Sequence, residues 1–119
     1  MDVFVFGSEN DKQAWQLADR IRPRFKGLEF IKTSNPNILV DKKDFIVMDV
    51  VEGIKEPILL GIDDIKSRSF VSMHDFDAGF FLKLMKSLDG LEVKIIGIPM
   101  SFDEKTVEKT VRLLQDIIR

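Results

Sequence analysis

The stretch Asp44-Phe-Ile-Val-Met-Asp-Val-Val51 decides the fold class, because it is the strongest strand signal in the chain. Its apolar residues follow one another without the alternation of a strand that has one face in water. Both faces of this strand must therefore be covered by other parts of the protein. Such a strand belongs in the middle of a mostly parallel sheet, so we expect residues 45–50 to form an internal strand.

Shorter runs of the same kind lie on either side of this stretch, at residues 3–6, 28–33 and 93–98. Residues 57–60 begin with a proline, which cannot donate to a sheet ladder, and they predict an edge strand. Alternating strands and helices predict an α/β protein. We expect a three-layer α/β/α fold with a mostly parallel twisted sheet of about five strands, in a single domain over residues 1–119.

Helical spacing of apolar residues marks the segments between the strands. Ala14, Leu17, Ala18, Ile21 and Phe25 predict a first helix, which Pro23 should end or kink. Residues 76–88 predict an amphipathic helix that stops at Asp89-Gly90. A capping-box pattern, Ser101-Phe-Asp-Glu104, begins the last helix, whose apolar positions are Val107, Val111, Leu114 and Ile118. Residues 34–43 form either a connection or a single helical turn, and the sequence does not decide between them.

Composition excludes several classes of function. The formal net charge of -2 provides no basic surface of the kind that binds nucleic acid. The chain has no cysteine, which excludes disulfides, thiolate catalysis and thiolate zinc sites. No apolar run approaches the roughly 20 residues of a membrane-spanning helix, and the first residues do not resemble a signal peptide. We expect a cytoplasmic protein that binds neither nucleic acid nor membrane.

Candidate site residues follow from the rule that open α/β sheets bind ligands at the carboxyl ends of their strands. Asp49 interrupts an apolar strand, so its carboxylate must be paired, exposed at the strand end, or a ligand. Its alternative role is to accept N–H groups of a neighbouring helix or loop. Asp11 lies where the first helix should begin, a common place for a carboxylate that only caps the helix. Glu9 is an equally good carboxylate on chemical grounds.

His74 is the only histidine of the chain. Ser72-Met-His-Asp75 resembles a capping box, which would place His74 in the first turn of a helix. The helix dipole there disfavours the imidazolium ion and leaves a neutral ring that can bind a metal. The alternative is a hydrogen-bonded surface histidine. Phosphate cradling is not supported, because Gly7-Ser-Glu-Asn lacks the further glycines of a nucleotide-binding loop.

Four short blocks, taken in order, resemble the hydrogenase maturation endopeptidases. These small α/β proteins trim the C-terminal tail of a nickel-hydrogenase large subunit after nickel insertion. The blocks are Val3-Phe-Val-Phe-Gly7-x-x-Asn10, Asp44-Phe-Ile-Val-Met-Asp49-Val, Ser72-Met-His74 and Ile95-Ile-Gly-Ile-Pro99. Each block alone is weak, but their order and spacing span almost the whole chain.

The resemblance implies a metal site and a function. Asp11, Asp49 and His74 fall on the positions that bind metal and act in catalysis in this family. Two carboxylates and an imidazole suit nickel, and zinc or cadmium can substitute. The nickel is carried by the substrate, and the partner implied is the large-subunit precursor. We expect a monomeric, metal-dependent endopeptidase.

One departure from the family pattern keeps other functions open. Glu9 replaces the second glycine of the family's turn. Several residues that the family has in this turn are missing here, at the point where Asn10 is followed directly by Asp11. This shortened turn favours a family-like domain that binds a metalloprotein subunit, as a scaffold or chaperone, without cutting it. A third possibility is an unrelated doubly wound binding module.

Overall fold

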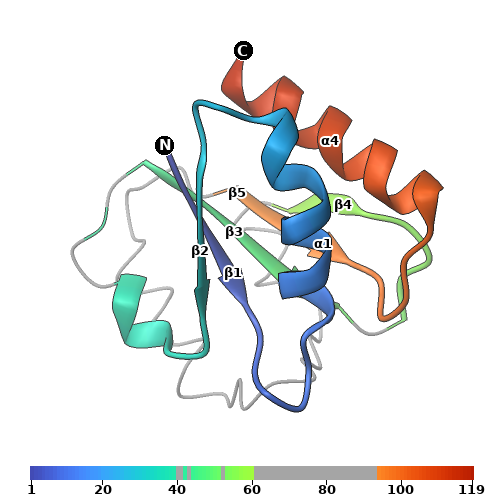
Figure 1. Ribbon diagram of the computed structural model, residues 1–119, viewed down its shortest axis with the longest axis horizontal. Helices are drawn as coiled ribbons and strands as arrows, with labels where there is room; N and C mark the ends of the chain where they lie inside the picture. The colour runs from blue at the N-terminus through green and yellow to red at the C-terminus, as the bar shows by residue number, and fades with distance from the viewer. Residues whose placement is uncertain (40–41, 43, 52, 61–93) are drawn as a thin grey trace.

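The computed structural model describes residues 1–39, 42, 44–51, 53–60 and 94–119. Its strands are β1 (Asp2–Phe6), β2 (Glu29–Thr33), β3 (Phe45–Val50), β4 (Ile58–Leu60) and β5 (Lys94–Ile98). Its α-helices are α1 (Gln13–Ile21) and α4 (Glu104–Ile118), and two short 3-10 helices are η1 (Arg22–Arg24) and η2 (Pro36–Leu39) (Figure 1). The predicted helix over residues 76–88 lies outside the described residues.

The five strands form one sheet in the order β2-β1-β3-β5-β4. The pairs β1–β2, β1–β3 and β3–β5 are parallel, and β4 runs antiparallel to β5 at the edge. Every residue of β3 is buried. The predictions of an internal strand at residues 45–50 and an edge strand after Pro57 are therefore confirmed.

Both faces of the sheet bury apolar side chains, as the apolar run Phe45–Met48 in β3 requires. On one face, Val3, Val5, Ile46 and Met48 pack in a cluster with side chains of α1 and α4. Figure 1 shows these two helices lying together over the sheet. On the other face, a second cluster contains Phe4, Phe6, Phe45 and Val47 together with Leu39 of η2. This arrangement confirms the three-layer α/β/α class with a mostly parallel sheet.

The first helix ends where its proline predicts. α1 stops at Ile21, and Pro23 lies in the 3-10 turn that follows. Phe25, which helical spacing assigned to the helix, instead lies in extended backbone after η1, but it is still buried in the core. The undecided segment 34–43 contains a single helical turn, η2.

The last helix begins two residues later than the Ser101–Glu104 pattern predicts, and that prediction is wrong. Asp103 is the N-cap, and its carboxylate accepts a hydrogen bond from the Thr106 backbone N–H at 3.0 Å. The Thr106 hydroxyl accepts from the Asp103 N–H in return, at 3.4 Å. The hydrogen bond from the Thr106 backbone N–H is the main reason why the pKa of the Asp103 carboxyl is lowered. Ile118, expected in the apolar stripe, is exposed at the helix end.

Ion pairs between exposed side chains join α4 to the first helical segment. Arg20 pairs with Glu104, and Arg24 pairs with Glu108 at 2.7 Å. The hydrogen bond from Arg24 lowers the pKa of the Glu108 carboxyl. Exposed pairs of this kind contribute little stability each, so the buried contacts beneath them hold the two helices on the sheet.

Candidate functional site

The order of the strands reverses between β1 and β3, and this reversal places the candidate site. The chain passes from β1 outward to β2, and later from β3 in the other direction to β5. Loops at the carboxyl ends of β1 and β3 therefore leave the sheet in opposite directions, which is where open α/β sheets bind ligands. Asp49 lies near the end of β3, and Asp11 lies in the loop that follows β1. Both predicted carboxylates are thus at this point of the sheet.

Asp49 is buried, with only 9% of its surface exposed. Its side chain faces the same side as Phe45 and Val47, away from α1 and α4, because side chains alternate along a strand. Its Oδ1 accepts a hydrogen bond from the Val50 backbone N–H at 2.8 Å. A carboxylate so poorly hydrated must be stabilised by its neighbours or by a bound cation. This position suits either a structural acceptor or a ligand.

Gly97 is the residue beside Asp49 on the neighbouring strand β5. A Cβ atom at this position would lie 2.8 Å from Cγ2 of Val51, closer than van der Waals contact allows. Val51 continues the ladder beyond β3, since its N–H donates to the Ile98 carbonyl at 2.8 Å. Only glycine lets Val51 pack against β5 here. The sequence carried a signal for this contact, because an isolated glycine in a strand of β-branched residues indicates a close approach.

The loop after β1 is short and internally hydrogen-bonded. The backbone N–H of Ser8 donates to the Asp11 carbonyl at 2.9 Å, and the Asp11 N–H donates to the Ser8 carbonyl at 3.1 Å. The Asp11 carboxylate accepts from the Gln13 N–H at the start of α1, at 3.4 Å. Glu9 instead extends into solvent, with its side chain 87% exposed and 3.5 Å from the ammonium group of Lys12. Asp11 is therefore the carboxylate held against the protein.

Trp15 fixes this loop to the end of β1. Its indole Nε1 donates to the carbonyl of Val5 at 2.9 Å, and its ring packs against the core. The ring lies so close to Gly7 that a Cβ there would be 2.7 Å from Nε1. The sequence places Gly7 in the block that resembles the maturation endopeptidases, but it does not predict this contact with Trp15. The close approach of the indole explains why this position has no side chain.

His74, with the expected capping box at Ser72, lies outside the described residues. Within the residues that the structure describes, no three His, Cys, Asp or Glu side chains gather as a metal-binding group. Asp11 and Asp49 are therefore two members of a predicted set whose third member is not described. In that same part of the chain, no helix is long and apolar enough to cross a membrane.

Comparison with known proteins gives a likeness of fold. No family model and no curated protein matches the sequence. Among solved structures, the [NiFe] hydrogenase maturation protease HybD from Thermococcus kodakarensis superposes with a TM-score of 0.65 and 18% identity, covering 100% of both chains. An uncharacterized protein from Wolinella succinogenes has a TM-score of 0.56 and 12% identity, covering 98% of this chain and 94% of that one. The chain therefore shares the fold of this hydrogenase maturation protease.

Proposed function

We propose that this protein is a metal-dependent endopeptidase that removes the C-terminal tail of a nickel-hydrogenase large-subunit precursor. The observation that carries the proposal is the full-length likeness to HybD, together with a buried carboxylate, Asp49, beside the reversal of strand order. A fold alone does not define a function, because one fold hosts many chemistries. The proposal therefore rests on the carboxylate lying where this fold would bind its ligand.

In this proposal Asp11, Asp49 and His74 bind the nickel ion that the precursor carries. Two carboxylates and one imidazole form a mixed oxygen and nitrogen set, which suits nickel and also accepts zinc or cadmium. The nickel belongs to the substrate, so its remaining positions stay with ligands from the precursor. Binding through the metal would hold the scissile bond beside the carboxylates. Hydrolysis adds one water to the peptide carbonyl, and a carboxylate can accept the proton of that water.

The geometry of the loop after β1 supports Asp11 over Glu9 as the first ligand. The Asp11 carboxylate is held at the start of α1 by the Gln13 N–H, so little freedom is lost when it binds. The Glu9 side chain is exposed and pairs with Lys12. To reach a site at the carboxyl ends of β1 and β3, the Glu9 side chain would have to leave solvent and give up its contact with Lys12.

Calorimetry with nickel, zinc and cadmium tests the metal site. The wild type should bind these ions weakly, because the natural metal arrives with ligands from the precursor. Asp49→Ala and His74→Ala should each reduce the affinity, whereas Asp116→Ala, which removes an exposed carboxylate near the end of α4, should not. Binding should weaken below about pH 6 as the imidazole protonates. Unchanged affinity in both site variants would exclude the proposed site.

Incubation with nickel-loaded precursor tests cleavage separately. The expected result is loss of the C-terminal tail, seen as a fall in precursor mass, and its absence with Asp49→Ala. A precursor that stays intact but elutes with this protein on a sizing column would contradict the protease. That outcome would instead identify a scaffold or chaperone with the same fold.

A further inference from the structure

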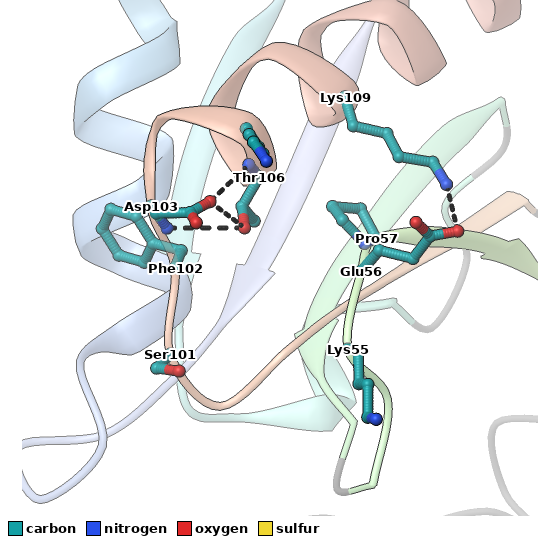
Figure 2. Close-up of a pocket in the computed structure, with 9 residues that line it drawn as sticks. Lys55, Glu56, Pro57, Ser101, Phe102, Asp103, Thr106 and Lys109 are labelled. Carbon is teal, nitrogen blue, oxygen red and sulfur yellow. Dashed lines mark hydrogen bonds and ion pairs between the residues drawn. The ribbon is translucent and has the colours of Figure 1, made fainter.

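A pocket of about 350 Å³ opens between the start of α4 and the segment that precedes β4. Figure 2 shows its two walls, with Ser101, Asp103 and Thr106 on one side and Lys55, Glu56 and Pro57 on the other. The pocket lies at the carboxyl end of β5, because α4 follows that strand and β4 runs antiparallel to it. Since α4 packs on one face of the sheet and Asp49 belongs to the other, this pocket is separate from the candidate metal site.

Some of the charged groups that line the pocket are paired with one another, and others are not. Three lysines and two acidic residues line it, which leaves one positive charge in excess. The Asp103 carboxylate accepts hydrogen bonds from the N–H and the hydroxyl of Thr106 at 3.0 and 3.1 Å. Glu56 pairs with Lys109 at 2.5 Å across the pocket (Figure 2). Among the described residues, no carboxylate pairs with the remaining two lysines, Lys55 and Lys105.

The groups left to attract an anion are these two ammonium groups, because the helix terminus is already capped. Asp103 already takes the Thr106 N–H at the start of α4, so the helix end is capped from within. Lys55 and Lys105 come from opposite walls and are both exposed. Figure 2 shows the Lys55 side chain extending away from the other labelled residues. To share one carboxylate with Lys105, this flexible chain must turn back over the pocket, and the charge-assisted hydrogen bonds it would then form are stronger than neutral ones.

The other lining groups favour a peptide over a phosphate. The hydroxyl of Ser101 and the outer oxygens of Glu56 and Asp103 can accept hydrogen bonds from peptide N–H groups. Phe102 and Pro57 add apolar surface for a neighbouring side chain. A phosphate dianion would bring a second negative charge towards Glu56 and Asp103, and it has no N–H groups to donate. The volume is near the lower end of that of ligand pockets, which fits two or three residues.

We propose that this pocket binds a short peptide segment through one carboxylate, held between Lys55 and Lys105. The inference goes beyond the proposed protease function, because it requires neither metal nor cleavage. The carboxylate can be the end of a chain or an acidic side chain, since both present the same two oxygens. The two sources are separated by the choice of peptide in the test.

The test is a titration of the labelled full chain with tripeptides, followed by two-dimensional amide NMR spectra. Acetyl-Ala-Ala-Glu-amide carries only a side-chain carboxylate, and acetyl-Ala-Ala-Gln with a free C-terminus carries only a terminal one. Acetyl-Ala-Ala-Gln-amide carries neither, and inorganic phosphate is the fourth ligand. At least one carboxylate peptide should shift the amide signals of Lys55, Ser101 and Lys105, with a Kd on the order of 1 mM.

Two variants make the result specific to the pocket. Lys105→Gln removes a charge from the pocket and should weaken peptide binding about two- to fivefold, because an ion pair formed by an exposed lysine contributes only modestly. Lys26→Gln removes an exposed lysine outside the pocket and should leave the affinity unchanged. The same spectra show whether each variant is folded. Four results would overturn the proposal: no saturable shifts at the pocket, equal binding of the neutral peptide, binding of phosphate alone, or equal losses in both variants.

Discussion

Replacing Gly7 by alanine tests the role that the structure gives to Trp15. The added Cβ would lie 2.7 Å from Nε1 and 2.8 Å from Cε2 of the indole, and 3.0 Å from the carbonyl oxygen of Asp11. The ring cannot move aside freely, because its Nε1 donates to the Val5 carbonyl at 2.9 Å and the side chain packs against the core. Either the indole gives up this hydrogen bond or the loop that carries Asp11 shifts.

The expected cost can be worked out from these contacts. Forcing a methyl group into a packed site costs about 1–3 kcal/mol, and loss of the indole–carbonyl bond costs about 0.5–1.5 kcal/mol. These two costs overlap, since breaking the bond is one way to relieve the contact. Alanine also restricts the unfolded chain, which returns about 0.4–1 kcal/mol. We expect Gly7→Ala to lower the free energy of unfolding by about 1–3 kcal/mol and Tm by roughly 4–12 °C.

Thermal and urea unfolding, followed by circular dichroism and by the emission of the chain's single tryptophan, would measure this effect. Gly27→Ala is the matched control, because nothing lies within 4 Å of a Cβ at that position, and it should be neutral or slightly stabilising. In a Trp15→Phe background, Gly7→Ala should cost about 1 kcal/mol less, since the nearest atoms are gone. Equal stability of the two glycine variants, or an undiminished cost in the Phe background, would refute the reasoning.

Three further predictions follow from β5, from α4 and from the candidate metal site. Gly97→Ala should destabilise the protein by about 1–2 kcal/mol through its contact with Val51. In urea unfolding, a Val51→Ala background should relieve much of that cost. If the costs of the two substitutions simply add, the contact is contradicted. The pKa of the Asp103 carboxyl is lowered below 3.8 in the folded chain, so its capping bond adds stability above that pH and loses it as the pH falls through the folded pKa. In Asp103→Asn, stability should therefore fall less steeply as the pH is lowered. The measurement is the urea midpoint of the helical signal between about pH 2 and 6. The same pH dependence in the variant and the wild type would contradict this. Asp49→Asn keeps an oxygen that can accept a hydrogen bond from the Val50 N–H, but it loses the negative charge. The variant should therefore fold like the wild type and bind nickel less tightly, as measured by calorimetry. Full nickel affinity would contradict a ligand role for Asp49.

The layers of the fold could be predicted because they depend on local patterns. The apolar run Phe45–Met48 in β3 requires cover on both faces, wherever the neighbouring strands come from. The structure places β3 in the middle of the sheet. The start of α4 could not be predicted in the same way. Ser101 and Asp103 each begin a pattern that can form a capping box, and local sequence does not decide between them. In the structure the cap is Asp103.

The surroundings of the candidate site depend on contacts between distant segments, and so were only partly predictable. That Asp49 is buried among apolar residues follows from its neighbours in sequence. That it lies beside Gly97 follows only from the pairing of β3 with β5. The packing of Trp15 on Gly7 likewise requires α1 to be folded back on β1. The roles of Asp11, Asp49 and His74 as ligands stay predictions.

The pairing of β3 with β5 also affects how the chain must be made. These strands are neighbours in the sheet, but Phe45–Val50 and Lys94–Ile98 are far apart in the sequence. During synthesis, β1, α1, β2 and β3 leave the ribosome well before β5. Until then one edge of β3, a buried and largely apolar strand, has its N–H and C=O groups open to any other extended chain. Unpaired edges of this kind promote aggregation, so chains truncated before residue 94 should be insoluble and cleared by proteases. A chain that includes β5 covers this edge of β3.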